Sequence, residues 1–132
     1  MKLVLDTNAY CLCDTAHEEA LSALEEARHI FLPVIAFGEL YYGFRHGARL
    51  QDNLKRLETF IEAFGVQIIL VDVNVARHFG DIYSSLRKKG RPIPTNDIWI
   101  AACCSAVEGT LLTADRHFSG VDQIELRLIE EG

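Results

Sequence analysis

Short apolar runs alternate with longer segments of helical periodicity along the chain. The run Leu3-Val4-Leu5 and the run around Leu111-Leu112 carry no charge, which is typical of strands buried on both faces. The full pattern predicts strands at residues 3–5, 30–32, 66–71, 110–113 and 124–128, and helices at residues 15–28, 33–43, 50–64, 76–90 and 97–107. Strands that alternate with helices imply right-handed crossovers. We therefore expect an α/β fold, a three-layer sandwich whose central, mainly parallel sheet is flanked by helices.

Two of these segments predict where the sheet is covered and where it ends. The helix that begins at Asp97 is apolar nearly all round, so we expect it to be buried rather than docked on the surface. In the last strand, Ile124, Leu126 and Leu128 alternate with charged residues, as in a half-exposed edge strand. In open parallel sheets, ligands bind at the carboxyl ends of the strands, so the chemistry is expected there.

Length and composition limit the classes of protein that the chain can be. With 132 residues, 49% hydrophobic and 24% charged, it is expected to form a single domain over residues 1–132 and not a disordered or fibrous chain. Neither Cys11 and Cys13 nor Cys103 and Cys104 have the spacing of a zinc site, and we expect no disulfide. The N-terminus meets Asp6 too soon for a signal peptide, and no apolar run is long enough to cross a membrane, which predicts a cytoplasmic protein.

The charge distribution is acidic overall but contains two basic stretches. The net charge is −6, so the chain has no global field that would attract a polyanion. Eight of the 13 cations nevertheless fall in two stretches, one between Arg45 and Arg56 and one formed by Arg87, Lys88, Lys89 and Arg91. Each stretch taken alone is explained by a solvated helix face. Any contact with nucleic acid is therefore expected to be local.

Four carboxylates stand out because of their positions relative to the predicted elements. Asp6 follows the first strand, Glu39 lies in the helix after the second, Asp97 opens the buried helix and Asp115 follows the Leu111-Leu112 strand. Three have simple alternative roles, because Asp6 can end a strand, Asp97 can favour a helix N-terminus and Asp115 can cap a turn. Glu39 has uncharged neighbours at helical spacing, and a lone carboxylate on such a face needs a partner.

If the four carboxylates converge, they need a bound cation or a proton. Like charges ~4 Å apart repel by about 4 kcal/mol per pair at an effective dielectric near 20, which is comparable with a large part of domain stability. Oxygen ligands suit Mg²⁺ or Mn²⁺. The chemistry that this combination favours is metal-assisted hydrolysis of a phosphodiester.

The four acids lie in four short motifs. The motifs are Leu5-Asp6-Thr7-Asn8, Gly38-Glu39-Leu40, Asn96-Asp97-Ile98-Trp99-Ile100-Ala101-Ala102 and Leu112-Thr113-Ala114-Asp115-Arg116-His117-Phe118. Together they resemble the motifs of PIN-domain ribonucleases, in particular the VapC-type toxins. The resemblance covers essentially the whole chain and implies Mg²⁺- or Mn²⁺-dependent cleavage of RNA by Asp6, Glu39, Asp97 and Asp115, supported by Asn8, Asn96 and Thr113. It also implies a homodimer and an antitoxin partner whose tail blocks the acidic site.

One residue departs from the family pattern. Members often carry another acid immediately before the Phe that ends the last motif, and this chain has His117 there. The departure puts a fifth acidic ligand and a second metal ion in question but leaves the four acids intact. His117 is also the only one of the five histidines that the sequence puts near the proposed centre.

Beside an acidic centre the second basic stretch gains a possible role. This stretch comes shortly before Asp97 and is a candidate for binding RNA phosphates; it consists of Arg87, Lys88, Lys89 and Arg91. Phosphate contacts would position the RNA without reading its base sequence.

Three other classes of protein compete with a nuclease. A phosphoacceptor signalling module could use Asp6 and Asp72, but it needs paired acids after the first strand and a Lys after the last. A haloacid-type phosphatase needs D-x-D where Asn8 stands. A catalytically silent PIN scaffold that only binds is the third, and the four acids argue against it.

Overall fold

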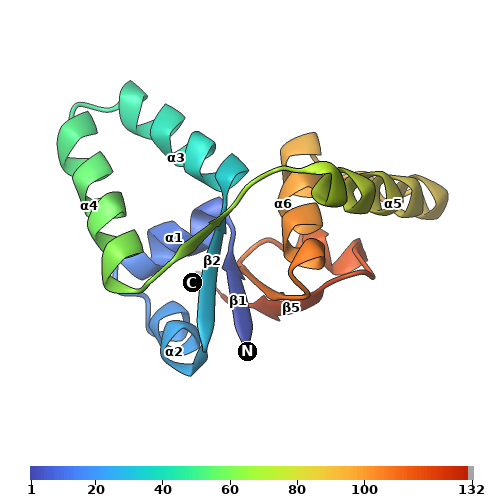
Figure 1. The fold of residues 1–132 in the computed structure, drawn as a ribbon, viewed down its shortest axis with the longest axis horizontal. Coiled ribbons are helices and arrows are strands. Elements are labelled where there is room, and N and C mark those ends of the chain that lie inside the picture. Colours follow the sequence, from blue (N-terminus) through green and yellow to red (C-terminus); the bar gives the residue numbers. More distant parts are fainter. Residues whose placement is uncertain (131–132) are drawn as a thin grey trace.

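Five parallel strands form one sheet at the centre of the computed structural model, which describes residues 1–130 (Figure 1). They lie in the order β3-β2-β1-β4-β5, and every neighbouring pair is parallel. The elements are β1 (Lys2–Leu5), α1 (Thr7–Asp14), α2 (Glu18–Glu26), β2 (His29–Pro33), α3 (Val34–His46), α4 (Leu50–Ala63), β3 (Gln67–Ile69), α5 (Val73–Lys89), α6 (Thr95–Ala106), β4 (Thr110–Thr113), the short 3₁₀ helix η1 (Arg116–Gly120) and β5 (Glu125–Leu128). This confirms the expected α/β sandwich with a parallel sheet.

The direction of the crossovers decides which helices cover which face. From β1 the chain moves to β2 and β3 on one side and returns past β1 to β4 on the other, so right-handed crossovers put α1 to α4 on one face and α5 and α6 on the opposite face. Figure 1 shows α1, α2 and α4 on one side of β1 and β2, and α5 and α6 on the other. The α3–α4 hairpin extends beyond the carboxyl end of β2.

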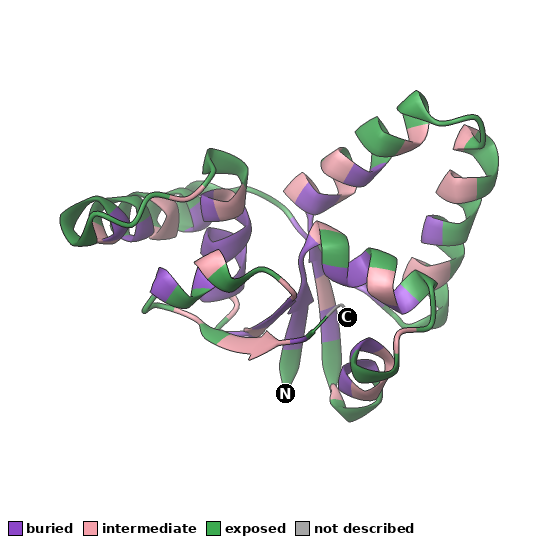
Figure 2. Cartoon of the chain, turned by 180° about the vertical axis from the view of Figure 1, so that it is seen from behind, coloured by how far each residue is buried: buried purple, intermediate pink, exposed green. Residues whose placement is uncertain are grey.

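The core lies where the central strands meet α6. Leu3, Val4 and Leu5 of β1 and Leu111 and Leu112 of β4 are all 0% exposed. Helix α6 is buried over most of its length, at Ile98 and from Ile100 to Ser105, as its apolar sequence predicts (Figure 2). Gly109 lets the chain pass between this helix and β4, because a Cβ at this position would lie 2.8 Å from Cγ2 of Val4. Strands β1 and β4 therefore lie close together at this point.

The first predicted helix was wrong in its bounds. Residues 7–14 form a separate helix, α1, and the expected helix of residues 15–28 is shortened to Glu18–Glu26. The physical reason is the break between them, where Ala16 has a left-handed φ of 60° and the His17 ring accepts a hydrogen bond from the Ala20 N–H as an N-cap. Asp6, expected at a strand end, is therefore also the N-cap of a helix.

Three further helix bounds differ from the prediction by two or three residues. Helix α5 begins at Val73 and not at residue 76, because Asp72 caps it. Helix α3 continues through Gly43 to His46, since a glycine inside a helix weakens it without ending it. Helix α6 begins at Thr95, so Asp97 lies in its first turn and does not open it. No helix among residues 1–130 is both long and apolar enough to cross a membrane.

Candidate active site

A pocket of about 490 Å³ opens at the carboxyl edge of the sheet, where the strand order reverses between β1 and β4. All four acids predicted from the sequence line it, although they come from three strand ends or following helices and from the first turn of α6. The full lining consists of Asp6, Thr7, Asn8, Glu39, Asp97, Ile100, Ala114, Asp115, Arg116 and Phe118. The structure therefore brings the predicted carboxylates together in one place.

Asp6 is the most enclosed of these carboxylates. It is 6% exposed, Oδ1 accepts a 2.7 Å hydrogen bond from the Ala9 N–H, and Oδ2 accepts a 2.5 Å hydrogen bond from Oγ1 of Thr113. Burial raises the pKa of Asp6 to about 6; the two hydrogen bonds oppose this rise, and the nearby Asp97 and Asp115 add to it. A nearby cation would offset the repulsion between the Asp6 carboxylate and the carboxylates of Asp97 and Asp115.

Glu39 has a partner that the sequence left unidentified. Its Oε1 accepts a 2.7 Å hydrogen bond from Oγ1 of Thr7, the first residue of α1, and the side chain is half-buried. Thr7 and Glu39 are 32 residues apart, and Thr7 also lines the pocket. The only sequence signal for Thr7 was its place between Asp6 and Asn8.

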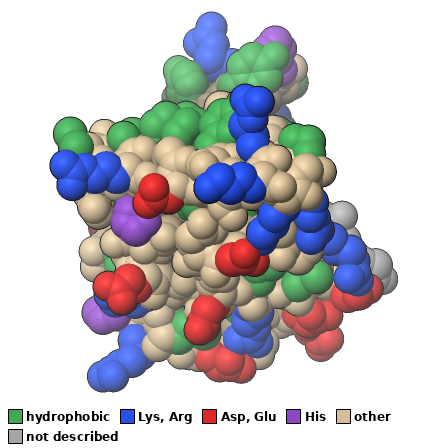
Figure 3. Space-filling view, turned by 90° about the vertical axis from the view of Figure 1, so that its right-hand side faces the viewer, with side chains coloured by type: hydrophobic (Ala, Val, Ile, Leu, Met, Phe, Trp, Pro, Cys, Tyr) green, Lys and Arg blue, Asp and Glu red, His purple; other side chains and the backbone are tan. Residues whose placement is uncertain are grey.

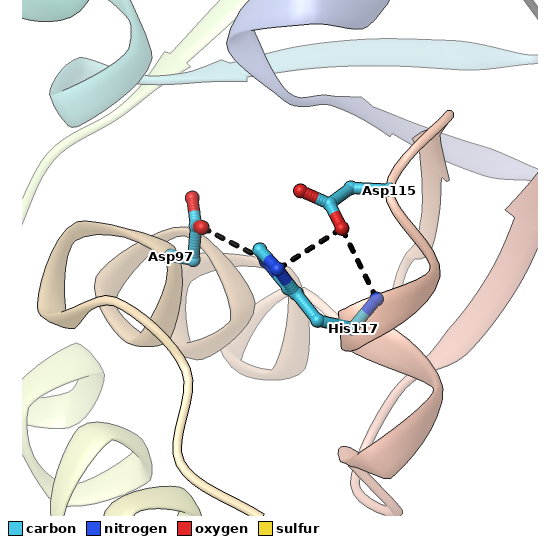
Figure 4. A group of neighbouring side chains, drawn as sticks. All are labelled: Asp97, Asp115 and His117. Carbon is cyan, nitrogen blue, oxygen red and sulfur yellow. Dashed lines mark hydrogen bonds and ion pairs between the residues drawn. The ribbon is translucent and has the colours of Figure 1, made fainter.

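The remaining two acids meet at His117. Nε2 of His117 lies 2.8 Å from Oδ2 of Asp97, and Nδ1 lies 3.0 Å from Oδ1 of Asp115. Asp115 also caps η1, because its Oδ1 accepts a 3.1 Å hydrogen bond from the His117 N–H. Figure 4 shows the imidazole between the two carboxylates. One potential ligand atom of each of the three residues lies within 4.8 Å of the other two. This is the tightest group of potential metal ligands among the described residues.

The pKa of Asp97 records the same convergence of charge. Partial burial raises it most, and the charges of Glu39 and Asp115 raise it further, while the His117 ring lowers it. The acids of α3, α6 and the β4–η1 turn thus act on one another electrostatically.

The three supporting polar residues have different places. Thr113 is fully buried, and its hydroxyl both donates to Asp6 and accepts a 3.0 Å hydrogen bond from the Asp115 N–H. Asn8 lines the acidic pocket, whereas Asn96 lines an adjoining one together with Thr7, Glu39 and Tyr42.

The second basic stretch lies outside the pocket lining. Arg87, Lys88, Lys89 and Arg91 are exposed at the end of α5 and in the loop after it. Figure 3 shows the molecule from the side on which α5 lies in Figure 1, and basic and acidic side chains are interspersed on that face. Lys89 forms an ion pair with Asp122 and donates a 2.9 Å hydrogen bond to the Gly120 carbonyl. The cation that does line the pocket is Arg116, which sequence reasoning missed, and it pairs with Glu130 at 3.0 Å.

The donor atoms fit a divalent cation. Four carboxylates line one pocket, burial and mutual repulsion raise the pKa of Asp6 and Asp97, and Nε2 of His117 is buried without a hydrogen bond within residues 1–130. A bound cation would remove the repulsion and give the ring nitrogen a partner. Asp97, Asp115 and His117 each present one potential ligand atom within 4.8 Å of the other two, and Asp6 and Glu39 line the same pocket.

The fold and the pocket define an α/β protein with a carboxylate site at the topological switch of a parallel sheet. A family model described as the PIN domain matches residues 3–124. The chain therefore belongs to the PIN-domain family.

Relatives and solved structures agree with this assignment. The chain is 31% identical over 125 residues to ribonuclease VapC2 of Haemophilus influenzae, covering 92% of each chain. It is 26% identical over 122 residues to ribonuclease VapC5 of Mycobacterium tuberculosis, covering 90% of this chain and 87% of the relative. The structure is similar, with a TM-score of 0.85 and 25% identity, to a chain of VapBC2 from Rickettsia felis bound to a promoter DNA fragment, covering 96% of this chain and 98% of that one. VapBC-5, described as a member of a family of toxin–antitoxin systems from Mycobacterium tuberculosis, gives a TM-score of 0.74 at 25% identity, covering 97% and 98%.

Proposed function

We propose that the chain is a metal-dependent endoribonuclease that hydrolyses RNA phosphodiester bonds, with residues 1–132 acting as one domain. The observation that carries the proposal is the convergence of Asp6, Glu39, Asp97 and Asp115 on one pocket of a PIN-domain chain. The relatives that match over most of the chain are named ribonucleases, which supports hydrolysis of RNA.

The pocket suits phosphodiester hydrolysis with Mg²⁺ or Mn²⁺. When bound, either ion would supply Lewis acidity at the scissile phosphate and offset its negative charge. Asp6 and Asp97, whose pKa values are raised, are the candidates for orienting the attacking water and accepting its proton. Thr7 and Thr113 fix the carboxylates of Glu39 and Asp6 by direct hydrogen bonds, and Arg116 supplies a positive charge at the wall of the pocket.

The competing phosphoacceptor module is not favoured. Its expected strand order is 2-1-3-4-5, whereas the order here is 3-2-1-4-5. Asp72, its second candidate acid, accepts a 2.9 Å hydrogen bond from the Val75 N–H as the N-cap of α5 and lines a different pocket. A silent scaffold is disfavoured because it has no need to retain four mutually repelling carboxylates in one pocket.

The decisive experiment measures RNA cleavage with Mn²⁺, with Mg²⁺ and with EDTA. We expect cleavage by the wild type with a divalent ion, and a loss of at least about 100-fold in Asp6→Asn and Asp97→Asn, the scale of removing a group that stabilises the transition state. Asp72→Asn is the matched control, because it removes a carboxylate outside the pocket and asparagine also caps helices. Cleavage that survives both pocket substitutions, or EDTA, would refute the proposal.

We further propose that the protein acts in the cytoplasm as the toxin of a type II toxin–antitoxin pair, as a homodimer whose site is blocked by an antitoxin. The similar VapBC structures support an antitoxin partner.

Exposed aromatic side chains on α3 support a protein interface. Tyr41 and Tyr42 are 37% and 66% exposed, whereas Phe37 and Phe44 pack against the core. Light scattering of the purified chain tests the dimer, and growth arrest on expression that Asp97→Asn abolishes tests the toxin.

A further inference from the structure

The residue that departs from the family pattern is the one that stands between two of the pocket acids. His117 lies on η1, whose neighbouring Phe118 is 1% exposed and anchors the turn in the core. The imidazole is 29% exposed as a whole, yet its Nε2 atom is buried. The ring is therefore directed into the acidic group rather than into solvent (Figure 4).

The short contact between His117 and Asp97 lacks the geometry of a hydrogen bond. Nε2 lies 2.8 Å from Oδ2 of Asp97 but forms no hydrogen bond within residues 1–130. Two adjacent ligand atoms on an octahedral ion, each about 2.1 Å from it, stand about 3.0 Å apart. The spacing of these two atoms therefore matches that of two donors that share one cation.

The other ring nitrogen of His117 lies at ion-pair distance from a second carboxylate. Nδ1 lies 3.0 Å from Oδ1 of Asp115, the oxygen that also accepts the His117 N–H. A carboxylate at one ring nitrogen fixes the tautomer and the ring orientation, and leaves the lone pair of the other nitrogen for the ion. The other oxygen of Asp115 has no marked contact with His117 in Figure 4.

We propose that His117 is a direct ligand of the divalent ion, through Nε2, and that it makes the site prefer Mn²⁺ to Mg²⁺. The proposal rests on the metal site of the proposed nuclease, but not on its catalytic activity. Imidazole nitrogen is a good ligand for first-row transition ions, whereas Mg²⁺ favours oxygen ligands and binds nitrogen poorly. An acid at this position would present a further oxygen, so the histidine changes the donor set from all oxygen to mixed nitrogen and oxygen.

The direct test is spectroscopic and needs no RNA. Mn²⁺ bound to the wild-type protein should give a ¹⁴N modulation in electron spin-echo spectra, and the modulation should change to that of ¹⁵N when the histidines are labelled with ¹⁵N. The modulation should disappear in His117→Asp. Absence of a histidine signal in the wild type, or its persistence in His117→Asp, would overturn the proposal.

A second measurement compares the two ions. The ratio of Mn²⁺ to Mg²⁺ affinity, from calorimetric titration, should fall at least about tenfold in His117→Asp, since substitutions around a metal site commonly change affinity by 10- to 100-fold. His29→Asp is the matched control, because His29 is exposed at the start of β2, at the opposite edge of the sheet. Equal ratios in the two variants would contradict the proposal. A protein that binds Mn²⁺ through His117 but cleaves no RNA would instead refute only the proposed function.

Discussion

The hydroxyl of Thr113 donates a 2.5 Å hydrogen bond to Oδ2 of Asp6, joining residues 107 positions apart at the carboxyl ends of β4 and β1. The same Oγ1 accepts a 3.0 Å hydrogen bond from the Asp115 N–H. One buried hydroxyl therefore fixes the side chain of one pocket acid and the backbone of another.

Thr113→Val should destabilise the protein, because valine has nearly the same shape but leaves the buried Asp6 carboxylate without this donor. We expect the free energy of unfolding to fall by about 1 to 3 kcal/mol, the usual cost of an unsatisfied buried polar group. Thr113→Ser retains the hydroxyl and is the control. Urea denaturation at neutral pH compares the two, and a valine variant as stable as the serine variant would count against this role of the hydroxyl.

Asp6 should make the stability of the metal-free protein fall as pH rises from about 4 to 6. Its folded pKa of about 6 lies above the ordinary value of 3.8, so over this range the folded state holds a proton that the unfolded state has released. The stabilisation is present below the unfolded value and is lost as pH rises through the folded value. Asp6→Asn should remove this slope and gain roughly 1 to 3 kcal/mol at pH 8.

Unfolding in EDTA at several pH values measures the slope, and Asp72→Asn should retain it, since Asp72 caps α5 outside the pocket. If Asp6→Asn keeps the wild-type slope, another group is responsible.

Thr7→Val should impair cleavage more than folding. Thr7 holds Oε1 of Glu39 at 2.7 Å, and a carboxylate free to rotate no longer has a fixed direction toward the ion or the substrate. We expect kcat to fall about tenfold, which corresponds to about 1.4 kcal/mol in the transition state. Thr7→Ser should restore most of the rate in the same assay, and equal rates in the two variants would exclude a positioning role.

The cations of the second basic stretch should not contribute equally to RNA binding. Replacing Arg87, Lys88 and Arg91 with glutamine should weaken binding and reduce the slope of log K against log salt by about 0.7 for each RNA phosphate that is no longer neutralised. Lys89→Gln should chiefly reduce stability, because Lys89 is engaged by Asp122 and the Gly120 carbonyl. Fluorescence anisotropy at several salt concentrations measures the slope. Arg28→Gln, before the amino end of β2, should leave it unchanged.

The sequence predicted the elements whose signals are local. The uncharged run at Thr110–Thr113 and the apolar helix before it were predicted closely, because burial leaves the strand without a charged residue and the helix with Asp97 alone. Helix α1 was missed because its eight residues are too few for a helical period to show. The break at Ala16 was missed because alanine rarely adopts a left-handed φ, so its presence does not predict one.

The sequence alone also identified the candidate acids of the site. Asp6 and Asp115 follow strands, Asp97 lies near the start of a helix, and Glu39 has uncharged neighbours at helical spacing. Only the tertiary structure decided how they are held: Thr7 on Glu39, Thr113 on Asp6, and His117 between Asp97 and Asp115. These contacts join residues brought together by strand order and crossover direction. A local pattern of polar and apolar positions carries no information about the distance between such residues in the folded chain.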